Sequence, residues 1–144
     1  MKTSQAGFDL IKRSEGLRLQ PYTDVADFLT IGYGHKVVPP ATYEHGITEQ
    51  TADMILAEDV QTAEDAINRL VKVQLTQGQF DALVDFVFNL GSGRLENSTL
   101  LILLNAGDYD GAAQQLLRWE YGGGQIMAAL KARREAELAM WSGK

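Results

Sequence analysis

Cysteine is absent from this 144-residue chain. The fold therefore uses no disulfide, no thiolate metal site and no thiol nucleophile, which suits a protein made in the cytosol. Long apolar runs are absent as well, since stretches such as Leu100–Leu104 fall far short of the ~18 residues that a bilayer span needs. The N-terminus shows no apolar core of a signal peptide. We therefore expect no integral membrane segment.

Positive charge is scarce. The chain has 13 Lys and Arg against 19 Asp and Glu, a formal net charge of −6. This balance argues against a nucleic acid partner, because such binding rests on a basic surface. Lys131, Arg133 and Arg134 nevertheless form a candidate basic patch near the C-terminus.

Two signatures of cofactor sites are also missing. No glycine-rich run precedes Lys-Ser or Lys-Thr, so the chain has no phosphate-binding loop. The two histidines, His35 and His45, lack the spacing of a helical zinc pair. We expect neither a cofactor nor a metal site.

What the chain does contain is typical of a soluble globular protein, with 45% hydrophobic and 22% charged residues. Its length suits one compact domain or two small lobes that share a core. Phe8 and Ile11, three residues apart, favour a helix over residues 4–14, which Gly16 can end. From Leu17 to Val38, aromatic and β-branched residues alternate with glycines, which is typical of short strands and tight turns.

The rest of the chain has helical patterns. A stripe of apolar residues spaced three and four apart follows Thr48, a suitable N-cap, and predicts a helix to about residue 71. The capping box Thr76-Gln79 starts the next expected helix, which ends at Gly91. A further helix starts at Ser98, and another starts at Asp108 or Asp110 and ends near Trp119. After a break at residues 122–124, a last helix ends near Trp141.

These patterns predict an α+β fold. A small β-containing lobe spans about residues 15–45, a connecting helix spans about 48–71, and a larger helical lobe spans about 76–144. The N-terminal helix is expected to pack on the helical lobe, so that the whole chain forms a single domain.

Two carboxyls near the N-terminus form a candidate pair for glycoside hydrolysis, which needs a proton donor and a second group that activates water or attacks the sugar. Glu15 lies where the first helix should end, and the negative end of the helix dipole disfavours an added anion there. This suits a general acid, although a nearby arginine would oppose the effect. Asp24 follows in a predicted turn, and the hydroxyl of Thr30 could help it hold a water molecule.

Each of these residues is ordinary when it is considered alone. A Glu before Gly is commonly a surface residue, and an Asp in a turn commonly bonds the local backbone. A Thr in a strand commonly reflects β propensity. The chemistry alone therefore leaves both interpretations open.

Their combination is more specific. Ser14-Glu15-Gly16, Pro21-Tyr22-Thr23-Asp24 and the run from Leu29 to His35 resemble the active-site segment of the phage-type lysozymes (endolysins), glycoside hydrolase family 24. That family has a Glu, eight residues, an Asp, five residues and a Thr, and Glu15, Asp24 and Thr30 match in identity and spacing. The resemblance continues, in the family's order, through residues 86–91, 97–101, 117–119, 133–137 and 141.

The resemblance implies a lysozyme-like fold and hydrolysis of the β-1,4 bond between N-acetylmuramic acid and N-acetylglucosamine in peptidoglycan, for host cell lysis. It implies that Glu15 is the general acid and that Asp24, aided by Thr30, positions a water molecule, with inversion at the anomeric carbon. It further implies a monomer without cofactors, whose partner is the peptidoglycan glycan strand. Release from the host cytoplasm to the periplasm and cell wall would use a holin-type pore. The expected substrate-binding residues are Tyr22, Lys36, Phe88, Asn89 and Ser98.

Three of the residues that the resemblance places near the active site also have structural interpretations. Tyr22 could simply pack in the small lobe, and Phe88 continues an apolar helix stripe. His35, which matches a family position near the site, could be paired so as to stabilise the lobe.

Some positions depart from the family pattern. Asp27 stands where the family usually has glycine, and Asp tolerates a left-handed turn better than most residues. It also adds a carboxylate near Asp24, which could shift the activity optimum. Lys36 replaces a Thr or an apolar residue, and residues 128–130 read Ala-Ala-Leu instead of Pro-Gly-Leu. Relatives with an N-terminal signal anchor exist, and this sequence shows no such segment.

Two other functions remain open from the sequence. The chain could be a catalytically inactive homologue that binds peptidoglycan, or its C-terminal amphipathic helix could act structurally or disrupt membranes. A transglycosylase, which leaves anhydro sugar ends, is a third possibility for the reaction itself.

Overall fold

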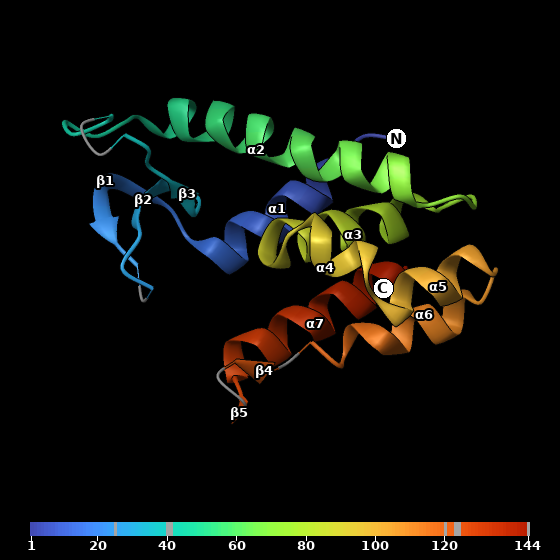
Figure 1. Cartoon of the computed structure of the whole chain (residues 1–144). Coiled ribbons are helices and arrows are strands. Elements are labelled where there is room, and N and C mark those ends of the chain that lie inside the picture. The colour runs from blue at the N-terminus through green and yellow to red at the C-terminus, as the bar shows by residue number, and fades with distance from the viewer. Residues whose placement is uncertain (25, 40–41, 120, 123–124, 144) are drawn as a thin grey trace.

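The computed structural model describes residues 1–24, 26–39, 42–119, 121–122 and 125–143. It contains a small lobe built on a three-stranded sheet, a long helix and a larger helical lobe (Figure 1). The predicted α+β class is therefore confirmed. In chain order the elements are α1 (Gln5–Glu15), β1 (Arg18–Thr23), β2 (Leu29–Gly32), β3 (His35–Lys36), α2 (Glu49–Leu70), α3 (Gln77–Leu90), α4 (Ser92–Glu96), α5 (Thr99–Asn105), α6 (Tyr109–Leu116), β4 (Tyr121–Gly122), β5 (Gln125–Ile126) and α7 (Ala128–Trp141).

The small lobe is an antiparallel sheet with the strand order β1-β2-β3. Its register places Tyr22 of β1 opposite Thr30 of β2, and Thr30 opposite Lys36 of β3. Residues that lie directly opposite each other in a sheet share a face. The sheet register alone thus brings three of the predicted site residues side by side.

Helix α2 connects the small lobe to the helical lobe. Thr48 caps it, because its hydroxyl accepts a hydrogen bond from the Thr51 backbone N–H at 3.1 Å. One stripe of the helix is buried along its length, from Ala52 near the sheet to Ile67 near the helical lobe. The same helix can therefore present residues to the cleft and to the core.

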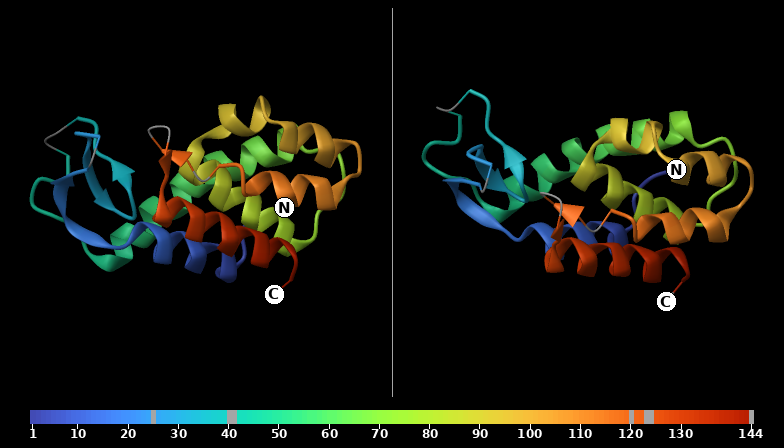
Figure 2. Two further views of the ribbon diagram at one scale, coloured as in Figure 1. Left: turned by 90° about the horizontal axis from the view of Figure 1, so that it is seen from below. Right: turned by 60° about the horizontal axis from the view of Figure 1, so that its bottom comes forward.

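Helix α3 lies at the centre of the helical lobe. Every residue from Phe80 to Val87 is buried, and such a helix must be covered on all sides. It packs against α1, α2 and α7, and Figure 2 shows α1 and α7 running alongside it in both views. The predicted capping box joins Thr76 and Gln79 at its start, and Gly91 caps its end.

The structure differs from the sequence-based expectation in its short elements. The five-residue helix α4 was not expected, because so short a segment carries no readable periodicity. Helix α6 ends at Leu116 and not near Trp119. The predicted break at residues 122–124 falls partly outside the described residues, and the small β4–β5 pair beside it was not expected. Among the described residues, no helix combines the length and the apolarity needed to cross a membrane.

Candidate active site

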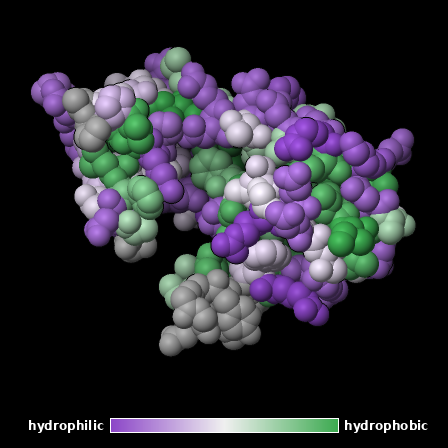
Figure 3. All heavy atoms as spheres, viewed as in Figure 1, coloured by the Kyte–Doolittle hydropathy of each residue, from purple (hydrophilic) through white to green (hydrophobic). Residues whose placement is uncertain are grey.

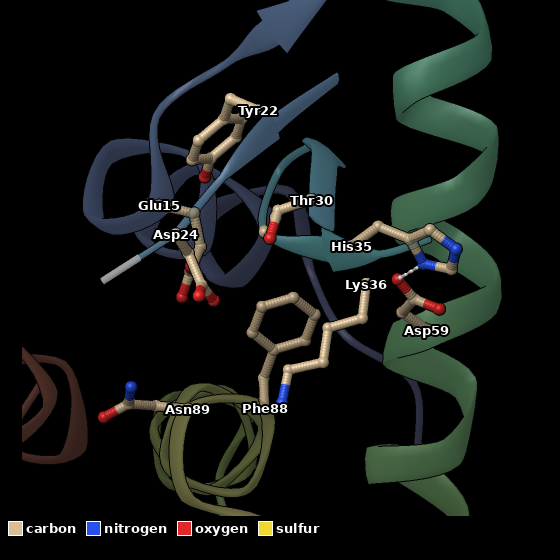
Figure 4. A pocket seen from close by; sticks show the side chains of 10 residues that line it. Glu15, Tyr22, Asp24, Thr30, His35, Lys36, Asp59, Phe88 and Asn89 are labelled. Atoms are coloured by element: carbon tan, nitrogen blue, oxygen red, sulfur yellow. Dashed lines mark hydrogen bonds and ion pairs between the residues drawn. The ribbon is translucent and has the colours of Figure 1, made fainter. Parts of the chain in front are cut away.

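A cleft of about 560 Å³ lies between the small lobe and the helical lobe. The space-filling view is hollowed between these two parts of the molecule (Figure 3). Side chains from the sheet and from α1 line one side, while α3 lines the opposite side (Figure 4). Its lining residues are Glu15, Tyr22, Asp24, Thr30, Gly34, His35, Lys36, Asp59, Phe88 and Asn89.

Glu15 enters the cleft from the last position of α1. Its side chain is 20% exposed, and its Oε2 accepts a hydrogen bond from Arg133 Nη1 at 2.6 Å. The two opposing influences considered from the sequence are therefore both present. The helix end disfavours a negative charge at this point, while the guanidinium favours it.

Asp24 follows β1 and is held by the backbone of its own turn. Its Oδ1 accepts hydrogen bonds from the N–H groups of Ala26, at 2.9 Å, and Phe28, at 2.8 Å. The turn includes Asp27, which has a φ of 66°, so the left-handed conformation expected at this departure from glycine is present. These bonds fix the orientation of the Asp24 carboxylate at the edge of the cleft.

Thr30 is 2% exposed and shares an anchor with Asp24. Its hydroxyl donates to the carbonyl oxygen of Phe28 at 2.9 Å, while the N–H of Phe28 bonds Asp24. Because the Thr30 proton is committed to that carbonyl, the hydroxyl oxygen retains lone pairs that can accept a hydrogen bond. Asp24 and Thr30 can thus hold one water molecule from two sides.

Four of the five expected substrate-binding residues line the cleft: Tyr22, Lys36, Phe88 and Asn89. Ser98 does not. It is 4% exposed, its hydroxyl accepts from the Leu101 N–H at 3.0 Å and donates to the Leu95 carbonyl at 2.7 Å. Ser98 therefore acts as the N-cap of α5, and capping consumes the hydroxyl that a sugar would need.

Sequence reasoning missed two partners of site residues. Arg133, which contacts Glu15, was assigned to a basic surface patch, but Arg133 and Arg134 are both buried. Asp59 of α2 was not singled out from the sequence, yet its Oδ2 lies 2.7 Å from His35 Nδ1. His35 thus has the paired, lobe-stabilising arrangement considered from the sequence, and this pair joins β3 to α2 (Figure 4).

Arg133 is itself held by a buried carboxylate on α3. It donates from Nε to Asp85 Oδ2 at 2.9 Å and from Nη2 to Asp85 Oδ1 at 2.8 Å. Although burial by itself would lower the pKa of Arg133, its contacts with Asp85 and Glu15 raise the pKa above the ordinary value. The arginine next to Glu15 is therefore a permanent cation. Within the described residues, no three His, Asp or Glu side chains are grouped as metal ligands.

Comparisons with known proteins identify the family to which this chain belongs. Residues 12–137 match the family described as phage lysozyme. The endolysin of Bacillus phage B103 is 45% identical over 145 residues, which is 98% of this chain and 54% of that protein. The chain thus spans about half the length of this relative.

Two solved structures resemble the chain over nearly its whole length. The muramidase domain of SpmX from Asticaccaulis excentricus is 38% identical, with a TM-score of 0.87 and coverage of 97% of both chains. A mutant of P22 lysozyme is also 38% identical, with a TM-score of 0.87 and coverage of 99% of both chains. With its fold, its cleft and these matches in agreement, the chain belongs to the phage lysozyme family.

Proposed function

We propose that this chain is a lysozyme that hydrolyses the β-1,4 bond between N-acetylmuramic acid and N-acetylglucosamine in peptidoglycan, as part of an endolysin for host cell lysis. The observation that carries the proposal is the meeting of Glu15 and Asp24 in one cleft. The two residues come from different elements, and they have different surroundings. Such a pair of carboxyls is what glycoside hydrolysis requires.

Glu15 is the general acid. When protonated, it donates a proton to the glycosidic oxygen as the bond to the anomeric carbon breaks. Its Oε2 is directed to Arg133, so Oε1, which faces Gly34, is the oxygen that carries the proton. The charge that remains on Glu15 after proton transfer is stabilised by the Arg133 guanidinium.

Asp24 and Thr30 supply the attacking water. The Asp24 carboxylate accepts a hydrogen bond from the water and takes up its proton, while the Thr30 hydroxyl oxygen accepts the second one. Attack from the face opposite the leaving group then gives inversion at the anomeric carbon. The fixed positions of both side chains, anchored through Phe28, reduce the entropic cost of orienting this water.

Four residues bind the sugars around the scissile bond. Tyr22 and Phe88 present aromatic surface to the cleft, and Lys36 and Asn89 present polar groups. The Lys36 ammonium lies 4.1 Å from the centre of the Phe28 ring, so it is held at the cleft edge by a cation–π contact. There it can meet the lactyl or peptide carboxylates of peptidoglycan.

The structure weakens the alternative that α7 disrupts membranes. Arg133 and Arg134, the basic residues that would contact a membrane, are buried and engaged with carboxylates. Lys131 alone remains exposed in the candidate basic patch. The inactive peptidoglycan-binding alternative is addressed by experiment.

The test compares wild type with Glu15→Gln and Asp24→Asn on permeabilised Gram-negative cells, followed by turbidity. Both substitutions keep the shape of the side chain, and Glu135→Gln on the exposed face of α7 serves as a matched control. We expect clearing by wild type and the control, and a loss of about 100-fold or more in each site variant. Equal clearing by all four proteins would exclude hydrolysis at this cleft.

The remaining expectations are proposals as well. The cleft is formed within one chain, which supports a monomer, to be checked by light scattering of the wild-type protein. Passage from the host cytoplasm to the wall through a holin-type pore remains a prediction. It is checked by fractionating host cells that express the protein with and without such a pore.

A further inference from the structure

Glu15 and four buried ionisable side chains behind it form one cluster, which joins three helices. Glu15 belongs to α1, Asp85 to α3, and Arg133, Arg134 and Glu137 to α7. Asp85, Arg134 and Glu137 are fully buried, and Arg133 is 8% exposed. Buried charges persist only when they are paired and hydrogen-bonded. The arrangement of charge in this cluster therefore determines the electrostatic environment of the Glu15 carboxyl group.

Asp85 sets the orientation of Arg133. Two parallel hydrogen bonds, 2.8 and 2.9 Å long, join the carboxylate of Asp85 to one edge of the guanidinium. This bidentate contact fixes the guanidinium plane and directs the remaining nitrogen, Nη1, at Glu15 Oε2, 2.6 Å away. Loss of the Asp85 charge would leave Arg133 with Glu15 as its anionic partner.

Glu137 lies close enough to Asp85 for hydrogen bonding between the two carboxyl groups to contribute to the pKa of each. Its Oε2 accepts from Arg134 Nη2 at 2.8 Å, whereas its Oε1 is buried and receives no hydrogen bond from the described residues. Two carboxyl groups can form a hydrogen bond only when one of them holds a proton. Oε1 of Glu137 is the oxygen whose surroundings fit that proton.

The balance of charge leads to the same assignment. In the state in which Glu15 is ionised, three carboxylates and two guanidiniums would carry a net negative charge, and a proton on Glu137 makes the cluster neutral. Burial, together with the neighbouring Asp85, raises the pKa of Glu137 well above its ordinary value. Burial alone would raise the pKa of Asp85 too, but hydrogen bonds from Glu137 and Arg133 outweigh it and lower that pKa.

We propose that Glu137 is a positioning residue for the general acid: it remains a neutral acid at the working pH, donates a hydrogen bond to Asp85, and thereby keeps Asp85 an anion that holds Arg133 on Glu15. The role of Glu137 in catalysis rests on the proposed hydrolysis, whereas its protonation state does not depend on that function. A second branch runs from Glu137 through Arg134 Nη2 to the side-chain oxygen of Asn89, at 2.9 Å, in the cleft wall.

Apart from Glu15 of α1, the charged and polar groups of the cluster around Glu137 come from α3 and from α7 itself. Helix α3 contributes Asp85 and Asn89, and α7 itself contributes Arg133 and Arg134. Helix α6 also packs on α7 and buries the apolar Ala112, Ala113 and Leu116, while its Asp110 is exposed. The Arg134 guanidinium lies 5.3 Å from the centre of the Phe86 ring, which supports its charge without a second carboxylate.

The first experiment reads protonation directly and needs no activity. Infrared difference spectra at pH 7 compare wild type with Glu137→Gln, and wild type with the exposed control Glu135→Gln. We expect the C=O band of a protonated carboxylic acid in the first difference and carboxylate bands alone in the second. Carboxylate bands alone in both differences, or failure of Glu137→Gln to fold, would overturn the proposal, because a neutral isostere should be accommodated.

The second experiment measures kcat and KM against pH on soluble glycan strands. The profile of Glu137→Gln should superimpose on wild type within about twofold, because glutamine reproduces the neutral acid. In Asp85→Asn, kcat should fall about tenfold or more with KM nearly unchanged. Its alkaline limb should move to lower pH, because Arg133 is then balanced mainly by Glu15.

The two experiments separate the possible failures. A shifted alkaline limb in Glu137→Gln would mean that Glu137 is ionised in wild type and would overturn the proposal. An Asp85→Asn profile identical to wild type would remove the positioning role. Wild type without hydrolytic activity would contradict the proposed function while the infrared result stood on its own.

Discussion

The carboxyl group of Glu15 lies directly against Gly34. A Cβ atom added to Gly34 would lie 2.5 Å from Glu15 Oε1. Among the described glycines, only Gly34 has the carboxyl group of Glu15 as the nearest neighbour of such a Cβ atom. Gly34 forms the turn between β2 and β3, and its φ is 73°. The turn of the small lobe thus closes over the oxygen that we assign to the catalytic proton.

Gly34→Ala should therefore remove most of the activity. The methyl group would displace Glu15 Oε1, and an alanine at this φ would add backbone strain of about 1 kcal/mol. We expect kcat/KM to fall about tenfold or more. The matched control is Gly107→Ala, where φ is also positive, at 85°, but no atom lies within 4 Å of the new Cβ. Equal activity in the two variants would show that the approach to Glu15 has no catalytic importance.

The hydroxyl of Thr30 should matter more than its shape. Thr30→Val keeps the branched side chain but removes the hydrogen bond to the Phe28 carbonyl and the acceptor for the water. We expect kcat to fall by about 100-fold and the free energy of unfolding to fall by about 1–2 kcal/mol. Thr30→Ser should retain most of the activity. Steady-state kinetics and urea unfolding measure both effects, and equal kcat values for the Val and Ser variants would contradict the water-positioning role.

The pair formed by His35 and Asp59 should couple the small lobe to α2. Each side chain is 29% exposed, so the coupling is modest. A double-mutant cycle with His35→Gln and Asp59→Asn should give about 0.5–1 kcal/mol by urea unfolding. The exposed pair His45–Glu44, at 3.2 Å, is the control and should show no measurable coupling. A zero coupling for the first pair would mean that its geometry contributes nothing to stability.

Glu137 should make the stability of the wild type depend on pH. Its pKa is raised on folding, so between the ordinary pKa and the raised one the folded state holds a proton that the unfolded state has lost. Wild-type stability relative to Glu137→Gln should therefore fall with increasing pH, by up to about 1.4 kcal/mol per pH unit in this window. Unfolding free energies of both proteins from pH 4.5 upward measure the trend. The stability difference between wild type and Glu135→Gln should show no such trend. If Glu137 were ionised in the folded wild type, the difference between wild type and Glu137→Gln would show no such fall with increasing pH either, which would contradict the account.

The helix boundaries were largely predictable because the signals for them are local. Thr48, Thr76, Ser98 and Asp108 each accept a hydrogen bond from a backbone N–H three residues on, as their position before a helix predicts. The same local chemistry misled the assignment of Ser98. A hydroxyl at a helix start looks the same in sequence whether it faces a sugar or its own helix.

The site was predictable only in part. Glu15, Asp24 and Thr30 were selected by resemblance to a family, since each is an ordinary residue in its local sequence. Arg133 is 118 residues away from Glu15 and reaches it only because α1 and α7 flank α3. No local pattern encodes such a contact. Arg133 and Arg134 therefore looked like a surface patch, when they are buried beside the general acid.

The chemical nature of the sugar ends released from purified peptidoglycan tests the central claim most directly. Digestion by the wild type, followed by borohydride reduction, should reveal new reducing ends on N-acetylmuramic acid. Glu15→Gln, which keeps the cleft but not the acid, should release none above background. Anhydro ends from the wild type, or reducing ends in equal yield from Glu15→Gln, would contradict hydrolysis by this carboxyl pair.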